Sequence, residues 1–158
     1  MVEQITDTLI GMLEDRPLEE ISISELCARA QVGRASFYRN FSSKEEVLHR
    51  HVRRLFATWG ESHRQEGGVS VSALVRSMFA HFEENRSFYR LLESRGLVHL
   101  FEDTMLASVG FDPAGPKEAA YTSAYAAYVL YGWAVVWFRR GMRESADELA
   151  GMLEAAGL

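Results

Sequence analysis

Apolar residues recur at spacings of three and four along nearly the whole chain, a period typical of amphipathic helices. No segment shows the sustained alternation of apolar and polar residues that predicts a half-buried strand. The first helix is predicted to end near Arg16 and Pro17, and its apolar face consists of Ile5, Leu9, Met12 and Leu13. The pattern predicts an all-α protein of about nine helices.

Capping residues and helix breakers indicate where these helices begin and end. Capping boxes are predicted at Ser22 to Glu25 and at Ser145 to Glu148, and Ser42-Ser43 followed by two glutamates is a further capping signal. A three-residue break at 31–33 precedes a short helix, and Gly67-Gly68 is the best linker candidate. The helices after the second are expected over 34–40, about 44–62, 71–82, around 88–92, roughly 97–109, from a turn at 110–116 to Arg140, and after Ser145.

One apolar segment raises the question of a membrane. Residues 119–138 run twenty positions without a charge, which is long enough to cross a bilayer. The segment is rich in alanine and tyrosine and poor in aliphatic residues, and a helix that is apolar on every side also suits the centre of a helical protein. We therefore expect a buried helix and no membrane partner.

Positive charge is concentrated in one part of an acidic chain. The whole protein has a net charge of −5, whereas residues 22–54 contain seven Arg or Lys against three Glu, a local surplus of +4. Because neutralising phosphates supplies much of the affinity for DNA, this segment is a candidate DNA-binding element.

The order of elements in this segment is typical of a helix-turn-helix, whose second helix lies in the major groove. Val32, Phe37 and Phe41 are spaced to hold this second helix against the first. The residues expected to contact bases are Arg34, Ala35 and Ser36, because Arg can read guanine, Ser either purine and Ala a thymine methyl group. The residues expected to contact phosphates are Ser22, Tyr38, Arg39, Asn40 and Lys44. Arg53 and Arg54 have no such role and are interpreted as solvated charges.

The sequence from Ala30 to Phe41, AQVGRASFYRNF, and the following SSKEEVL resemble the DNA-binding signature of TetR-family transcriptional regulators. The resemblance covers about residues 5–50. It implies a three-helix head, here residues 1–48, and a helical body for ligand binding and dimerisation, residues 49–158. It also implies backbone contacts by Ser22, Tyr38 and Lys44. Two turn positions depart from the family: Gln31 stands where Gly is common, and Gly33 where Ser is common.

The body resembles the family more loosely, around residues 88–92 and 131–141, and the resemblance implies a homodimer formed by the last two helices. The long apolar helix offers two faces for such an interface. One consists mostly of small residues: Ala119, Ser123, Ala126, Ala127, Leu130, Ala134 and Trp137. The other consists of Tyr121, Tyr125, Tyr128, Gly132 and Val135. Either face fits the interface.

Two interpretations are open for the aromatic residues of the body. They fit a pocket for a small, partly aromatic effector, or a packed core in which tyrosine hydroxyls are hydrogen-bonded. The pocket would be lined by Trp59, Phe82, Tyr89, Tyr121, Tyr125 and Tyr128.

The other candidate chemistries are weak. The histidines have no matching metal-ligand spacing, and His63, His81 and His99 are interpreted as surface or boundary residues. We therefore expect no metal, no cofactor and no catalytic residues. Cys27 is the only cysteine and is expected to be a buried structural thiol in a cytoplasmic protein.

The leading hypothesis is a homodimeric DNA-binding regulator, most often a repressor in this family, that binds a palindromic operator and is released by a small-molecule effector. Two alternatives are a helical co-activator or protein-interaction module that retains the head with little DNA affinity, and a small-ligand carrier that uses only the body.

Overall fold

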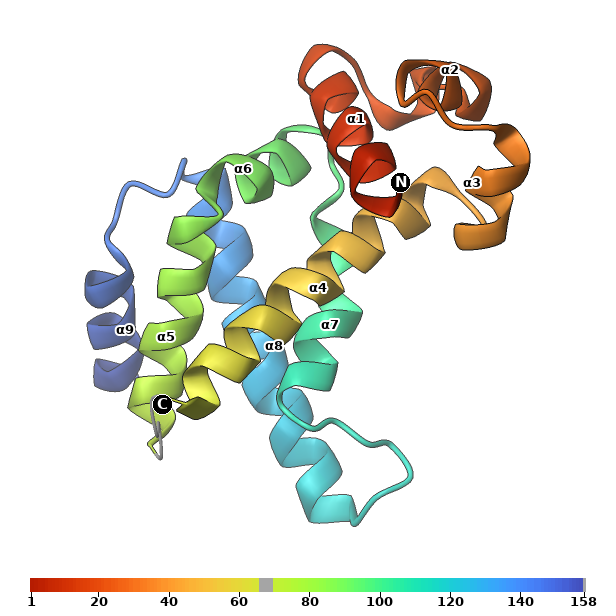
Figure 1. Ribbon diagram of the computed structural model, residues 1–158. Coiled ribbons are helices and arrows are strands. Elements are labelled where there is room, and N and C mark those ends of the chain that lie inside the picture. Colours follow the sequence, from red (N-terminus) through yellow and green to blue (C-terminus); the bar gives the residue numbers. More distant parts are fainter. Residues whose placement is uncertain (66–69, 158) are drawn as a thin grey trace.

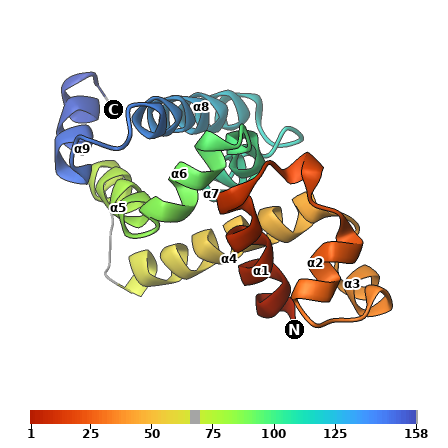
Figure 2. The ribbon, with the colours of Figure 1, turned by 90° about the horizontal axis from the view of Figure 1, so that it is seen from above.

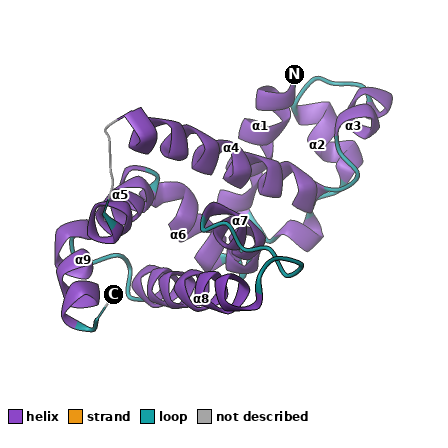
Figure 3. Ribbon diagram, turned by 90° about the horizontal axis from the view of Figure 1, so that it is seen from below, coloured by secondary structure: helices purple, strands orange, loops and turns teal. Residues whose placement is uncertain are grey.

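The computed structural model describes residues 1–65 and 70–157, and over these ranges the chain forms nine α-helices and two 3-10 helices without a strand (Figure 3). The predicted linker Gly67-Gly68 lies outside the described residues. The α-helices are α1 (Val2–Asp15), α2 (Ile23–Arg29), α3 (Arg34–Asn40), α4 (Lys44–Gln65), α5 (Val71–Glu84), α6 (Arg86–Ser94), α7 (Glu102–Ser108), α8 (Lys117–Arg139) and α9 (Ala146–Ala155). The 3-10 helices are η1 (Leu18–Glu20) and η2 (Val98–Phe101).

The predicted all-α class is confirmed, and one predicted helix is divided. The segment expected as a single helix over 97–109 consists of η2 followed by α7. Gly96 has φ +69 and ends α6, because the left-handed conformation stops the helix at low cost in glycine. The amides of Gly96 and Leu97 then bond back to the carbonyls of Glu93 and Leu92. The next segment therefore starts in a new direction.

Helices α1 to α3 gather at one end of the molecule, and α5 to α9 form a larger group at the other (Figures 1 and 2). The long helix α4 begins beside α3 and runs from the first group across the second. It is buried near its start, where Val47 and Leu48 are inaccessible, and at its middle, where Phe56 is buried among the later helices. One continuous helix thus packs against both groups.

The first group of helices has its own apolar centre. Phe37 of α3 is fully buried and lies 5.7 Å from the ring of Phe41, which is also buried. Leu26 and Cys27 of α2, which precede the turn between α2 and α3, are also buried. Burial raises the pKa of the Cys27 thiol. Cys27 is therefore buried and protonated, as a structural thiol should be.

The second group is built around aromatic rings. Phe82 of α5 and Tyr89 of α6 are both fully buried, and their rings meet edge to face at 4.8 Å. Phe138 of α8 stacks on Tyr89 at 5.4 Å and contacts Phe82 at 5.3 Å. These contacts join three helices into one core, because edge-to-face and stacked aromatic pairs pack at such separations.

Helix α8 buries one of the two faces that the sequence offered as candidates for the dimer interface. The buried residues are Ala127, Leu130, Ala134, Trp137 and Phe138, so the small-residue face lies against the body along its C-terminal part. The tyrosine face points to solvent, with Tyr121, Tyr125 and Tyr128 exposed. Val136 is exposed on this face, whereas the predicted Val135 is half-buried. In the described part of the chain, no helix combines the length and apolar character needed to cross a bilayer.

Candidate DNA-binding site

The start of α2 is fixed by Ser22, which caps the helix. The Ser22 hydroxyl accepts a hydrogen bond from the Glu25 amide at 3.1 Å. The predicted capping box forms only by half, because the Glu25 carboxylate pairs with Arg16 and, at 3.5 Å, with Arg29. Glu25 therefore ties α2 to the end of α1, and Ser22 lies exposed at the helix start, where a phosphate oxygen could approach its hydroxyl.

The turn between α2 and α3 contains a strained residue. Gln31 has φ +53, a left-handed conformation that is costly for a residue with a Cβ atom. The amide of Gln31 bonds to the Ala28 carbonyl at 3.2 Å, and the amide of Val32 bonds to the Cys27 carbonyl at 2.9 Å. This pair of bonds is a Schellman motif, in which glycine is the preferred left-handed residue. Gln31 therefore adopts the left-handed backbone conformation whose energetic cost was expected from the sequence. Gly33 is the N-cap of α3.

Gln31→Gly is expected to raise the free energy of unfolding by about 1 kcal/mol, because glycine removes the left-handed strain. Urea unfolding followed by circular dichroism measures the change. The same substitution at exposed Gln4, inside α1, should lower the free energy of unfolding by about 1 kcal/mol, since glycine is a poor helix former. A loss of stability in Gln31→Gly would contradict the assignment of strain to this turn.

Helix α3 presents one apolar and one polar face. Phe37 and Phe41 are buried and Val32 is half-buried, so all three predicted contacts with the rest of the head are present. The residues on the other side are Arg34, Ala35, Tyr38 and Arg39, all exposed, together with half-buried Ser36 and Asn40. The residues of α3 that were predicted to contact bases and phosphates therefore all lie outside the apolar face of the helix.

Hydrogen bonds within α3 already engage part of this face. The Arg39 guanidinium donates to the Ser36 hydroxyl at 2.7 Å, and the Asn40 amide donates to the Ser36 carbonyl at 2.7 Å. Arg34 at the start of α3 forms no ion pair within the described residues. Arg34 is therefore exposed, charged and able to reach a ligand from the N-terminal end of the helix.

Lys44 has a second role that the sequence did not indicate. Its ammonium group donates to the carbonyls of Leu18 and Ile21, both at 2.6 Å. These bonds tie the first residue of α4 to the segment between α1 and α2. A lysine ammonium has three donors, so one is left for a phosphate oxygen. Lys44 thus holds the head together and can still contact DNA.

The remaining cations of the basic segment fall into two groups. Arg54 pairs with Glu3 of α1 at 2.7 Å, so its charge is used within the protein. Arg50 lies over the Phe41 ring, 5.5 Å from its centroid. Neither Arg50 nor Arg53 forms an ion pair among the residues described. The Glu46 carboxylate, whose pKa is lowered by hydrogen bonds from Ser42 and also by Arg53 and Arg50, offsets part of the charge of α4, and a surplus of positive charge remains on α3 and the first half of α4.

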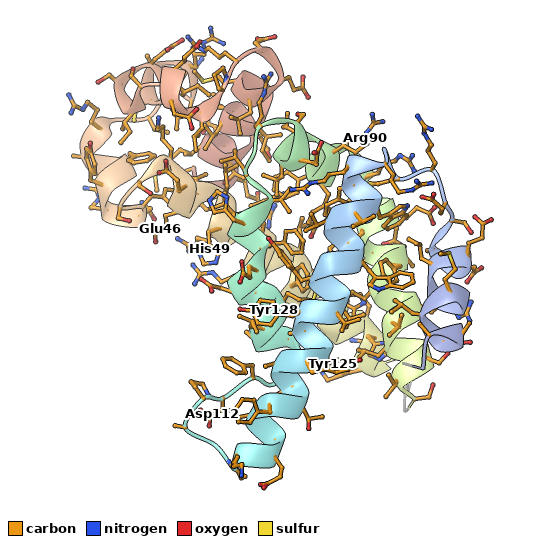
Figure 4. The ribbon with its side chains drawn as sticks, turned by 180° about the vertical axis from the view of Figure 1, so that it is seen from behind. Glu46, His49, Arg90, Asp112, Tyr125 and Tyr128 are labelled. Carbon is orange, nitrogen blue, oxygen red and sulfur yellow. The ribbon has the colours of Figure 1, made fainter. Side chains whose placement is uncertain are left out.

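The six predicted effector residues lie in three places rather than around one cavity. Phe82 and Tyr89 belong to the closed core, and Trp59 is half-buried on α4. Tyr121, Tyr125 and Tyr128 are exposed on α8, with 74%, 64% and 52% of their surface accessible. Figure 4 shows Tyr125 and Tyr128 along the outer side of α8. The Tyr128 hydroxyl donates to the Glu102 carboxylate at 3.1 Å.

A groove of about 870 Å³ lies between α4 and α5. Its wall on α4 includes Trp59, whose indole N–H donates to the Ser77 hydroxyl of α5 at 2.8 Å. Its lining also includes His81, which is only 5% exposed, and burial lowers the pKa of this imidazole to about 4. His81 therefore presents a neutral ring to the groove at neutral pH.

The interpretation of His81 as a surface or boundary residue was wrong. Its Nε2 atom lies 3.0 Å from the buried Tyr89 hydroxyl, so the pair satisfies two polar groups inside the core. The signal was present in the sequence: His81 follows Met78 by three positions and so shares the apolar side of α5. No group of His, Cys, Asp or Glu residues able to hold a metal occurs in the described part of the chain.

Comparison with known proteins gives one match to the first group of helices and others that extend over nearly the whole chain. Residues 5–50 match the family described as bacterial regulatory proteins, tetR family. Over 93% of its length the chain is 22% identical to YxbF of Bacillus subtilis (strain 168), an uncharacterized HTH-type transcriptional regulator, and it spans 42% of that protein.

Two solved structures have a similar fold. Lin0861 from Listeria innocua superposes with a TM-score of 0.78 at 19% identity, covering 98% of this chain and 89% of the other. The dihydroxyacetone kinase operon activator DhaS superposes with a TM-score of 0.62 at 16% identity, covering 98% and 92%. At these identities the likeness concerns the fold alone.

Proposed function

The chain belongs to the tetR family of bacterial regulatory proteins through residues 5–50, and from this premise we propose that it is a DNA-binding transcriptional repressor that binds a palindromic operator as a homodimer. The observation that carries the proposal is α3, which is buried on one side through Phe37 and on the other exposes Arg34 and Arg39, neither of which forms an ion pair with a described residue. A rigid helix with an exposed polar face is the element that a helix-turn-helix places in the major groove.

We assign base contacts to Arg34, Ala35 and Ser36 because they occupy the N-terminal half of α3, the part that reaches base edges in this motif. Arg34 can donate two hydrogen bonds to guanine. Ser36 reaches a base when Arg39 leaves its hydroxyl for a phosphate. Phosphate contacts are assigned to Ser22, Tyr38, Arg39, Asn40 and Lys44.

We propose that the exposed face of α8, together with α9, forms the dimer interface. The exposed apolar residues on these helices are Tyr121, Tyr125, Tyr128, Val136 and Met152. A hollow of about 590 Å³ between the helices is lined by Gly132, Trp133, Val136 and Met152, among others. Contiguous exposed apolar surface of this kind marks interaction sites, and a two-fold interface places the same surface on both chains.

The head, residues 1–48, and the body, residues 49–158, then have different functions. The head binds DNA and the body holds the two copies together, with α4 joining them. Effector binding in the body would release DNA by favouring a different spacing of the two heads. Such a protein acts on the chromosome, which implies a cytoplasmic location and no enzymatic activity.

We propose that the effector binds in the α4–α5 groove, which includes one of the six expected pocket residues, Trp59. Its lining combines aromatic rings with hydroxyl groups and the imidazole of His81, and the guanidinium groups of Arg54 and Arg76 are paired with carboxylates outside the groove, which suits a small aromatic molecule with hydrogen-bonding groups.

Filling this groove should abolish the thermal stabilisation that an effector gives. Ala80 lines the groove, and Ala80→Phe adds a ring to it. A compound present at about 100 times its Kd stabilises a protein by about 2.7 kcal/mol, which a thermal shift detects. Screening a library of small aromatic compounds should yield compounds that raise the Tm of the unmodified protein but not of Ala80→Phe. The matched control is Ala107→Phe, at an exposed alanine of α7 that does not line the groove. Equal shifts in both variants would place the effector elsewhere.

Selection of binding sites from random DNA tests the DNA-binding proposal. The expected product is a two-fold symmetric sequence whose half-sites lie about one helical turn apart, and the affinity for it should fall steeply with added salt. Recovery of no preferred sequence would favour the interaction module or the ligand carrier instead. Activation is the second candidate for the sign of regulation, because one protein of the same fold is named an operon activator. A reporter gene behind the selected operator separates the two signs.

A further inference from the structure

Helix α6 joins the DNA-binding head to the far end of α8 through two arginines. The helix lies between α1 and α5 (Figures 1 and 2). Arg86 is its first residue, and Arg95 follows directly after its last. Nine positions separate the two arginines, which is two and a half helical turns, so their side chains leave α6 on opposite sides.

Arg95 binds the end of α1. Its Nε atom donates to the Leu13 carbonyl at 2.6 Å, and its guanidinium also donates to the Glu14 carbonyl at 2.7 Å. These carbonyls belong to the last turn of α1, where they have no partner within the helix. The end of a helix also carries partial negative charge, which favours a cation, and α1 has no basic residue of its own in that turn.

Arg86 makes the equivalent contact with α8. It donates to the carbonyls of Gly141 at 2.9 Å and Met142 at 2.6 Å, just after α8 ends. A positive charge in the first turn of a helix is unfavourable to that helix. The position of Arg86 is therefore explained by its contact with α8 and not by α6 itself.

The turn after α6 and the core contacts of Tyr89 hold α6 in place. Gly96 ends α6 with a left-handed turn, and this turn fixes the backbone position of Arg95, the residue before it. Tyr89, in the middle of α6, is held by His81 of α5 and stacks on Phe138 of α8. Helix α6 is thus anchored in the body and contacts the head at its C-terminal end.

We propose that Arg95 is a positioning residue for operator binding: by fixing α1 to α6, it sets the orientation of the head on the body and therefore the spacing of the two heads in the dimer. This inference rests on the proposed function. Arg95 touches no DNA in this account, so its loss should change how two heads fit one operator and not how one head reads one half-site.

The test compares Arg95→Ala with the unmodified protein on three kinds of DNA: the selected operator, the same operator with one base pair added or removed between half-sites, and a duplex carrying a single half-site. For Arg95→Ala we expect affinity for the operator to fall on the order of tenfold, from the loss of two charge-assisted hydrogen bonds that pre-position the head. The penalty for altered spacing should shrink, and half-site affinity should stay unchanged.

Two variants complete the design. Arg95→Lys keeps the charge and can still donate to the carbonyls, but from a compact ammonium without the planar fork of arginine, so it should restore spacing preference in part, and it replaces Arg95→Ala if the latter does not fold. Arg90→Ala removes an exposed arginine from the same helix, labelled in Figure 4, that has no hydrogen bond within the described residues, and it should behave as the unmodified protein.

Each result decides the matter. Unchanged operator affinity and spacing preference in Arg95→Ala would overturn the inference, and so would an equal loss on operator and half-site, which indicates general damage to the head. If the unmodified protein selects no symmetric site, the proposed function itself fails, and that result is obtained before any variant is measured.

Discussion

Val136→Glu is expected to convert the dimer to a monomer and to weaken binding to a two-half-site operator by roughly 10²–10⁴-fold, the gain that linking two binding modules provides. Val136 lies on the tyrosine face of α8 and is 55% exposed in the single chain. In a two-fold interface the new carboxylate would lose its water and would be introduced on both chains at once. Sedimentation measures the association, and titration of operator DNA measures the affinity.

The matched control is Val71→Glu, the same change at a valine that is 62% exposed at the start of α5. It should leave both association and DNA binding intact. Because Val136 already faces solvent in the single chain, neither substitution should unfold the protein. A Val136→Glu variant that remains dimeric would show that the interface lies elsewhere.

Arg34→Ala is expected to cost about 1–3 kcal/mol of operator binding and to relax the preference at one base pair of each half-site. Arg34 is exposed at the first position of α3, so its removal leaves the fold unchanged and takes away only the contact with DNA. Affinities for operators carrying each of the four base pairs at that position measure both effects.

Arg39→Ala provides the contrast within the same helix. Arg39 is exposed on α3 and is assigned to a phosphate, so its loss should weaken all sequences about equally and reduce the salt dependence. If Arg34→Ala behaves in the same way, with base preference kept, Arg34 is a phosphate contact as well.

The head was predictable from the sequence because its determinants are local. The α3 helix occupies the predicted residues 34–40, and Ser22 caps α2 as expected. Helix caps, breaks and apolar spacing act over a few residues, so they can be recognised without knowing what lies across the fold. The cost of Gln31 could be anticipated for the same reason, since it depends on one backbone angle.

The partners of the long side chains could not be predicted. Lys44 bonds to carbonyls twenty-six and twenty-three positions earlier, and Arg95 bonds to α1 more than eighty positions away. Nothing in the neighbouring residues indicates such contacts, because they depend on where separate helices come together. The same holds for the partner of His81: the burial of this residue follows from its position on the apolar side of α5, but Tyr89 belongs to the next helix.

The sequence by itself determined the class of fold, the helix order and the residues that α3 can present to DNA, since period and capping are properties of short segments. Only the tertiary structure decided which face of α8 is buried, because a helix apolar on all sides carries no signal of its own orientation. Packing against the body covers Ala127, Leu130 and Ala134, and it leaves Tyr121, Tyr125 and Val136 exposed.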